Sequence, residues 1–236
     1  MIISAESIVL HSRRYGDSSR IVTLYTRELG KVNVVAKGVR TTKSAIGAAL
    51  EPLSHCRCVI YHGTNKELHT LSQAETLSQR RNLITLEHLQ SGLMMCEAIV
   101  RTQTQEQTDE HVFELLSKAL NVLDTVDESC SYSVSVAMRC RLTEVMGFGL
   151  QFIPPPAEQA SVFIDVTDGS VVPAGVGINM TRSAYGAMYA SRRGHWSSID
   201  ESDKLEIESL LSLYFSHHLE RRVVSQTFSH LRLVIS

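Results

Sequence analysis

The residues of this chain with the clearest chemical role are cations near its N-terminus. Lys31 and Lys37 frame a run in which polar and apolar residues alternate, the period of a β-strand with one buried face. The alternation predicts that Val32, Val34 and Ala36 face a core and that the two lysines face solvent. The outward face of this strand is therefore expected to be cationic.

A basic loop follows the strand and extends its charge. The loop begins at Gly38, contains Arg40 and Lys43, and has no acidic residue before Ser44. It completes a cluster of cations in one stretch of the chain: Arg13, Arg14, Arg20, Lys31, Lys37, Arg40 and Lys43. Clusters of this kind bind the phosphates of nucleic acids. The alternative is a solvated cationic strand that discourages aggregation.

Aromatic side chains are scarce in the same region. Its tyrosines are Tyr15, Tyr25 and Tyr61, and it contains no Phe and no Trp. Because bases stack on aromatic rings, a surface with few rings is expected to contact chiefly the phosphate backbone. Binding should then tolerate any base sequence and weaken steeply with salt.

The formal net charge of −2 conceals a strong segregation along the chain. Residues 1–80 hold eleven Lys and Arg against six Asp and Glu, a net charge of +5, whereas residues 81–236 carry −7. A basic N-terminal part beside an acidic remainder indicates that the N-terminal part meets a polyanion.

Motifs of enzymes are not found. Residues 38–44 approach a phosphate-binding loop, but the second glycine of that motif is missing, so its backbone amides are not expected to wrap a phosphate. No nucleophile elbow, metalloprotease helix or Ser-x-x-Lys element is present in the sequence. We therefore expect that the chain is not an enzyme.

Cysteines and histidines near residue 60 are candidate ligands for a zinc ion. Cys56 and Cys58 lie close to His55, His62 and His69, but Cys-x-Cys on a strand points both thiols to one face and differs from the usual Cys-x2-4-Cys spacing. Buried core cysteines are the favoured interpretation. The five cysteines are too few and too scattered for a disulfide framework, so free thiols are expected and no metal site is predicted.

The elements that position the cations are short strands. Strand-like runs separated by polar turns cover residues 3–12, 19–26, 31–38, 52–62 and 66–72. Five such strands suit a small closed barrel, because closure leaves no exposed sheet edge. An OB-type barrel over residues 1–80 is the leading interpretation.

Helical spacing replaces this pattern after residue 80. Leucines recur every three or four residues over 83–96 and again over 113–123, and further helices are expected at about 132–146, 181–191, 202–219 and 226–233. Residues 148–180 interrupt the helices with three consecutive prolines, at 154–156, and a hairpin that turns at Asp168-Gly169. The predicted class is α+β: a barrel (1–80), then a helical domain (81–236) with a small β-hairpin inserted.

The sequence has no uninterrupted apolar run long enough to span a membrane, and its first residues do not read as a signal peptide. We expect a cytoplasmic protein.

Several short segments resemble a known family. The runs SIVL (7–10), YGDS (15–18), TRELG (26–30) and VAKGVR (35–40), followed by Lys43-Ser44, are similar to the N-terminal barrel of the bacterial DNA repair protein RecO family. Weaker similarity continues through residues 50–53, 68–75 and 213–225, and the order of barrel, helices, insert and helices is that family's layout.

The resemblance implies a mediator of recombinational repair without enzymatic activity. Such proteins bind single- and double-stranded DNA, anneal complementary strands, interact with RecR and the C-terminal tail of single-strand binding protein, and help load RecA. The resemblance implies DNA contact for Arg14, Arg20, Lys37, Arg40 and Lys43, and the strand-face argument adds Lys31. It also implies a cytoplasmic, nucleoid-associated protein.

Two further expectations concern the helical part. Many family members carry a four-cysteine zinc module in the insert, but residues 148–180 here contain no Cys and no His, so no zinc or other cofactor is expected. An acidic protein tail needs an apolar groove with a basic rim, for which Arg139 and Arg141 are the candidates. The alternatives are an adaptor that acts mainly through its helical domain and an RNA-binding chaperone on an OB barrel.

Overall fold

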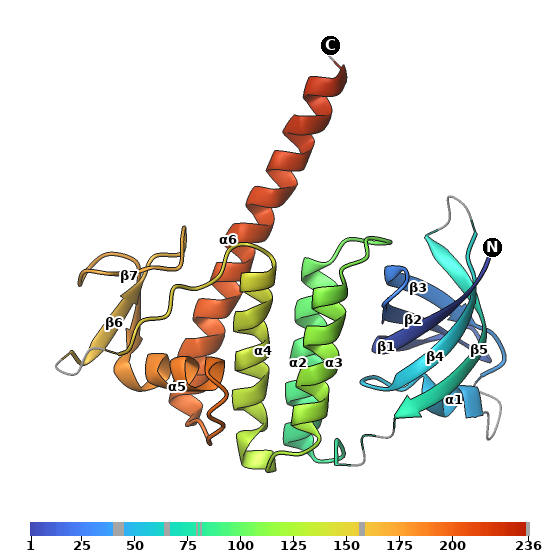
Figure 1. Ribbon diagram of the computed structural model, residues 1–236, viewed down its shortest axis with the longest axis horizontal. Coiled ribbons are helices and arrows are strands. Elements are labelled where there is room, and N and C mark those ends of the chain that lie inside the picture. The colour runs from blue at the N-terminus through green and yellow to red at the C-terminus, as the bar shows by residue number, and fades with distance from the viewer. Residues whose placement is uncertain (40–44, 64–66, 79, 81, 156–158, 235–236) are drawn as a thin grey trace. The chain divides into compact units, whose positions relative to one another are not determined.

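Five strands close into a barrel at the N-terminal end of the chain, in the order β1-β2-β3-β5-β4 (Figure 1). Neighbouring strands are antiparallel, except that β3 and β5 are parallel. The strands are β1 (Ile2–Tyr15), β2 (Ser19–Thr26), β3 (Gly30–Ala36), β4 (His55–Tyr61) and β5 (Leu68–Ser78). The OB-type barrel predicted from the sequence is confirmed.

The computed structural model describes residues 1–39, 45–63, 67–78, 80, 82–155 and 159–234, and it describes side chains as far as Leu219. The chain divides into two compact units, Met1–Glu128 and Ser129–Ser236. Among the helices of the described residues, none combines the length and the apolar character that crossing a membrane requires.

The core of the barrel follows from the period-2 pattern of its strands. Val32, Val34 and Ala36 of β3 are fully buried, as the alternation predicted, and Val22 and Leu24 of β2 meet them from the neighbouring strand. Both cysteines of β4, Cys56 and Cys58, join this core with their Sγ atoms 3.5 Å apart. The predicted free, buried thiols at these positions are confirmed.

Two features of the barrel differ from the sequence prediction. A short helix, α1 (Ala45–Ala49), precedes β4, where only a loop was expected. Strand β5 continues to Ser78, six residues beyond the predicted end, because its second half pairs with β4 while most of its side chains stay exposed. Exposed polar residues there carry no inward-facing pattern from which a strand can be recognised.

Two helices complete the first unit, lying side by side in Figure 1. Helix α2 (Leu86–Thr102) begins after Thr85, whose hydroxyl accepts a hydrogen bond from the His88 amide. Helix α3 (Glu110–Leu123) begins after Asp109, whose carboxylate accepts from two backbone amides of the first turn. The boundary predicted at residue 80 marks the change from strands to helices, whereas the compact unit extends to Glu128.

The second unit combines three helices with a three-stranded sheet of order β7-β6-β8. A single 3-10 turn, Glu128–Cys130, leads into it. Its elements are α4 (Ser131–Val145), β6 (Ser161–Ile164), β7 (Val171–Val172), β8 (Ile178–Thr181), α5 (Arg182–Arg192) and α6 (Glu201–Val234). Buried side chains of the sheet, including Val162, Ile164 and Met180, pack in one core with α5 and α6.

The predicted hairpin of the insert is confirmed. Phe163 and Ile164 pair with Val172 and Val171, and Gly169 takes a φ of +74° in the turn between the strands. The structure adds β8, which the sequence did not reveal, and it joins the two predicted C-terminal helices into one, α6.

Candidate nucleic-acid interface

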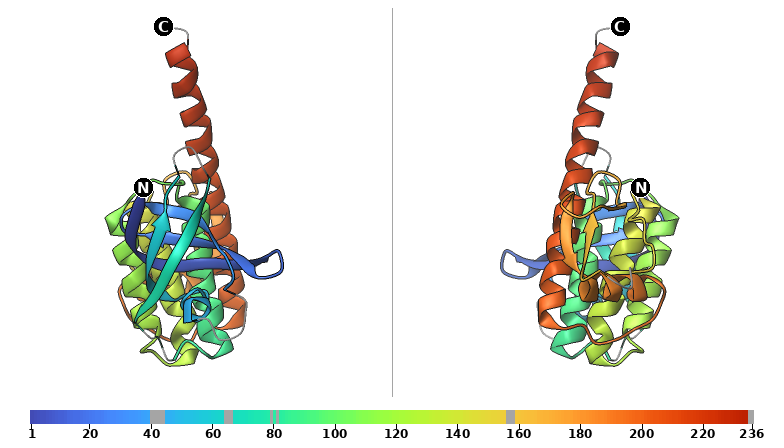
Figure 2. Two further views of the ribbon diagram at one scale, coloured as in Figure 1. Left: turned by 90° about the vertical axis from the view of Figure 1, so that its right-hand side faces the viewer. Right: turned by 90° about the vertical axis from the view of Figure 1, so that its left-hand side faces the viewer.

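Three of the predicted cations lie at the same end of three adjacent barrel strands. In the β1–β2 register Arg14 is opposite Arg20, and in the β2–β3 register Arg20 is opposite Ala36, the residue before Lys37. Adjacent strands are only about 5 Å apart, so positive charges from three strands gather at one end of the barrel. The tip of the β1–β2 hairpin, which carries Arg14, extends beyond the rest of the barrel (Figure 2).

The surroundings of these cations differ. Arg14 and Lys37 are exposed, as is Arg13 beside them. Arg20 is partly buried, and its guanidinium forms an ion pair of 2.7 Å with Glu51. Arg13, Arg14 and Lys37 are therefore accessible to a ligand, whereas Arg20 already has a carboxylate partner.

An exposed aromatic ring lies at the same hairpin tip. Tyr15 ends β1 with about half of its surface exposed, whereas Tyr25 is fully buried in the first unit. The sequence alone could not separate these two tyrosines, because both follow an apolar or basic run on a strand. Arg40 and Lys43 of the basic loop lie outside the described residues.

Lys31 lies at the opposite end of β3, six residues from Lys37, which separates the two along the strand by about 20 Å. Its ammonium donates a hydrogen bond of 2.7 Å to the carbonyl oxygen of Val100 in the last part of α2. Burial lowers the pKa of Lys31 below its ordinary value. The side chain thus joins the helix to the barrel, a role that the period of the strand could not indicate.

The TRELG segment also joins the helices to the barrel. Arg27 reaches three carboxylates, those of Glu6, Glu110 and Glu114, at 3.2, 2.9 and 2.5 Å. Its guanidinium also lies over the ring of Phe113, 4.5 Å from the centroid. The hydrogen bond with Glu114 is the main reason that the pKa of Arg27 is raised. Arg27 is thus already paired with two carboxylates of α3.

The two arginines proposed for partner contact have opposite surroundings. Arg139 is 5% exposed, and both its terminal nitrogens donate to the Glu208 carboxylate at 2.8 and 2.7 Å. Burial opposes the charge of Arg139, but hydrogen bonding to Glu208 outweighs it and raises the pKa of the guanidinium. Arg141 is exposed and donates one hydrogen bond of 3.3 Å to the carbonyl oxygen of Arg192.

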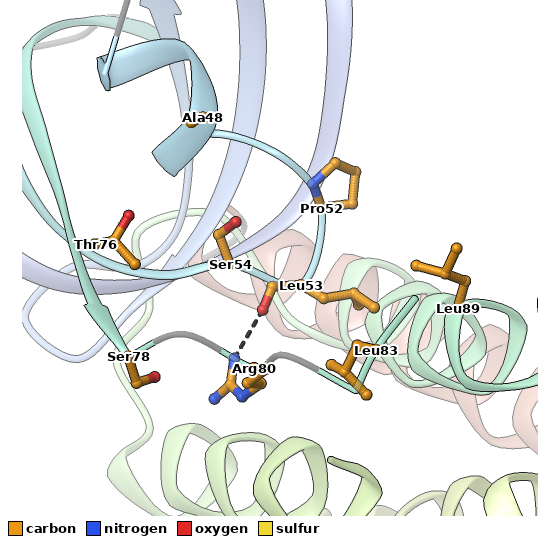
Figure 3. Close-up of a pocket in the computed structure, with 9 residues that line it drawn as sticks. All are labelled: Ala48, Pro52, Leu53, Ser54, Thr76, Ser78, Arg80, Leu83 and Leu89. Atoms are coloured by element: carbon orange, nitrogen blue, oxygen red, sulfur yellow. Dashed lines mark hydrogen bonds between the residues drawn. The ribbon is translucent and has the colours of Figure 1, made fainter. Parts of the chain in front are cut away.

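A pocket of about 300 Å³ opens in the first unit between the barrel and the start of α2 (Figure 3). Leu53, Leu83 and Leu89 supply apolar walls, and Arg80 lies to one side of them, near Leu83. Arg80 donates to the Leu53 carbonyl oxygen at 2.7 Å, while its Nη2 is buried and has no hydrogen-bond partner among the described residues. A guanidinium beside apolar walls suits a ligand that joins an apolar group to an anion. No pattern in the sequence pointed to this residue.

The family models match both parts of the chain. Residues 1–80 match the model described as Recombination protein O N terminal, and residues 85–227 match Recombination protein O C terminal.

Curated relatives extend this similarity over the whole chain. The DNA repair protein RecO of Nocardioides sp. is 30% identical over 251 residues, which cover 97% of this chain and 99% of that protein. The DNA repair protein RecO of Thermobifida fusca is 31% identical over 235 residues, covering 93% and 95%. The DNA repair protein RecO of Salinibacter ruber is 30% identical over 182 residues, covering 73% and 68%.

Proposed function

The chain belongs to the recombination protein O family of DNA repair proteins, and from this premise we propose that it binds single- and double-stranded DNA and promotes annealing of complementary strands. The observation that carries the proposal is the convergence of Arg14, Arg20 and Lys37 at one end of three adjacent strands. The basic loop with Arg40 and Lys43 continues directly from this end in the sequence.

The proposed mechanism is electrostatic. Two DNA strands repel each other through their phosphates, and a protein that neutralises those phosphates lowers the repulsion between them. Arginine and lysine side chains at a barrel end contact phosphates without reading base edges, so the bases stay free to pair. Tyr15 offers one exposed ring on which a base of a single strand can stack. No covalent step is required, which agrees with a protein that is not an enzyme.

Partner contacts complete the proposal. In this proposal the chain acts with RecR, helps RecA displace single-strand binding protein, and works in the cytoplasm at the nucleoid. In this proposal the acidic tail of single-strand binding protein contacts the exposed Arg141, which donates a hydrogen bond to the carbonyl oxygen of Arg192 at the end of α5. Arg139 would act through its pair with Glu208 by holding this part of α4 in place. No zinc is expected in residues 148–180, which lack both Cys and His.

The proposal is tested by reversing two exposed charges. Fluorescence anisotropy of a labelled, mixed-sequence single strand is measured against salt for the wild type and the Arg14→Glu, Lys37→Glu double variant. Each phosphate contact contributes about 0.7 to the slope of log affinity against log salt, so the variant should bind more weakly and lose roughly 1.4 from its slope. Annealing of two complementary labelled strands should slow in parallel.

Lys118→Glu is the matched control, because this exposed lysine of α3 lies in the same unit but outside the barrel end. Its affinity and slope should stay near those of the wild type. An unchanged slope in the double variant, with full affinity, would contradict the basic-end proposal. No DNA binding even at low salt would favour the adaptor that acts through the acidic residues 81–236, and a preference for RNA of equal length would favour the chaperone.

A further inference from the structure

Two histidines and a glutamate from three separate segments meet at one end of the β4–β5 pair. His62 follows β4, His69 lies in β5, and Glu106 lies in the connection between α2 and α3. The Nε2 atoms of His69 and His62 are 2.7 and 3.3 Å from the same oxygen, Oε1 of Glu106. The two imidazole rings stack with their centroids 4.2 Å apart.

The backbone fixes the direction of each side chain. His69 is opposite Val34 in the parallel register of β3 and β5, and its side chain is almost completely buried. The amide of Glu106 donates to the carbonyl oxygen of Lys31 at 2.9 Å, which ties the α2–α3 connection to the start of β3. Glu106 also takes a φ of +57°, a conformation that is uncommon for residues other than glycine. Strained backbone of this kind is retained where a side chain must be aimed.

The three side chains present a donor set that transition metals prefer. Their ligand atoms, two imidazole nitrogens and one carboxylate oxygen, all lie within 4.8 Å of one another. Two histidines and one glutamate are a known set for zinc, in which a fourth position is left for water or another ligand. His62 also lines a hollow of about 270 Å³, so one side of the group is open to solvent.

We propose that His62, His69 and Glu106 bind a divalent transition-metal ion, with Zn²⁺ as the expected ion. A metal ion bound to both Nε2 atoms requires each neutral ring to carry its proton on Nδ1. For His69 this change removes the acceptor of the Gly63 amide, which lies 3.3 Å from Nδ1. Metal binding is thus coupled to the backbone after β4.

The neighbouring cysteines do not provide the same chemistry. Cys56 and Cys58 lie in the barrel core, and the contact with Cys58 together with burial raises the pKa of the Cys56 thiol. Neither cysteine has exposed surface, so both thiols lie out of reach of an ion that enters from solvent. Among the residues that the structure describes, His62, His69 and Glu106 are the group of three such side chains whose ligand atoms lie close enough for one ion.

Metal binding at this site would connect segments that are far apart in the sequence. A metal held by all three residues links the end of β4 and the start of β5 to the α2–α3 connection, which already contacts β3. Because the ion binds the folded chain and not the unfolded one, it raises the midpoint of thermal unfolding.

The test is calorimetric titration of Zn²⁺ into the full, metal-stripped chain, repeated with His62→Ala and Glu106→Gln. These two residues are partly exposed, so their variants are expected to fold, whereas removal of the buried His69 side chain would leave a cavity. The wild type should bind one ion and gain thermal stability, and each variant should bind at least about tenfold more weakly. His11→Ala, an exposed histidine of β1, is the matched control and should behave like the wild type.

Cobalt(II) supplies a second readout, because its absorption distinguishes thiolate ligands from imidazole and carboxylate. The proposal expects a cobalt spectrum without a sulfur charge-transfer band and a shift of the Gly63 amide resonance on metal binding. It is overturned if no ion binds, if binding is undiminished in both variants, or if the cobalt spectrum shows sulfur ligands.

Discussion

At the scale of single residues, burial determines what each cation is able to do. Arg14 and Lys37 are exposed at the barrel end, whereas Lys31, Arg27 and Arg139 are held by carbonyl or carboxylate oxygens of their own unit. A guanidinium that is already paired with a carboxylate gains little from a second anion, because the existing ion pair must be broken first. Ligand binding is therefore expected at the exposed members.

Arg141 provides a prediction at this scale. Arg141→Glu should weaken binding of an acidic peptide with the sequence of a single-strand binding protein tail by about tenfold, since an attractive charge at the proposed contact becomes repulsive. Anisotropy of a labelled peptide measures the effect. Leu89→Asp in the Arg80 pocket is the comparison variant. Weaker binding in that variant alone would move the tail to the pocket and contradict the assignment to Arg141.

A second prediction at this scale concerns Glu208, which pairs with Arg139. Glu208→Gln leaves Arg139 buried without its counter-charge and should lower the free energy of unfolding by about 2 kcal/mol, less than for a fully buried pair because Glu208 is partly exposed. Hydrogen bonding to Arg139 outweighs the effect of burial and lowers the pKa of Glu208 from 4.5. A lowered pKa means that this stability is present above pH 4.5 and is lost as the pH falls below it, and the variant should lose that part of the acid dependence. Urea unfolding at several pH values measures both effects.

At the scale of elements, the start of β3 and the α2–α3 connection form one junction. Thr26 closes the TRELG turn by donating to the Gly30 carbonyl oxygen at 3.2 Å, and Gly30 takes a φ of +66°. A methyl group on Gly30 would lie 2.0 Å from the carbonyl oxygen of Gln107. The glycine is therefore needed both for its backbone conformation and for the close approach of the connection.

Gly30→Ala tests this junction. It should lower the free energy of unfolding by about 2–4 kcal/mol, because a left-handed backbone and a steric overlap with backbone act together. Gly16→Ala is the matched control, with a similar φ of +57° but nothing within 4 Å of the added methyl group, and it should cost only about 1 kcal/mol. Urea unfolding measures both variants. Equal decreases in the free energy of unfolding would show that the close approach to Gln107 does not contribute to the effect of Gly30→Ala.

At the scale of the whole molecule, the compact unit that contains the barrel also contains α2 and α3. Tyr25 of β2 is fully buried and stacks with the buried Phe113 of α3 at 6.4 Å, and Arg27 binds two carboxylates of the same helix. A barrel cut at residue 80 would expose Tyr25 to water and leave Arg27 without these partners. The loss of buried apolar area should destabilise it.

Two fragments test this division. Residues 1–128 should unfold in one cooperative transition and keep the salt-dependent affinity for single-stranded DNA, whereas residues 1–80 should unfold at a lower urea concentration. Circular dichroism against urea and the anisotropy titration provide the measurements. A stable 1–80 fragment with the same midpoint would show that α2 and α3 do not contribute to the barrel, and loss of DNA binding by a folded 1–128 fragment would support the adaptor.

The sequence by itself determined which residues face the barrel core, since the alternation of Val32, Val34 and Ala36 reflects the two faces of a strand, a local property of the backbone. In the same way it predicted the Asp-Gly turn of the insert and a helix that ends near residue 146, where α4 ends at Val145. Local rules did not reveal β8, α1 or the second half of β5, because those segments are stabilised by neighbours distant in the sequence.

Only the tertiary structure decided how the charged residues are used. The alternation placed Lys31 of β3 and Lys37, which follows β3, on the same face. Lys31 nevertheless donates to Val100 of a helix about 70 residues away, whereas Lys37 is exposed. His62, His69 and Glu106 come together from three segments for the same reason. A sequence pattern indicates which face of a helix or strand a side chain lies on. Long-range packing determines which other segment covers that face. Whether a charged side chain is structural or free to bind a ligand depends on that covering segment.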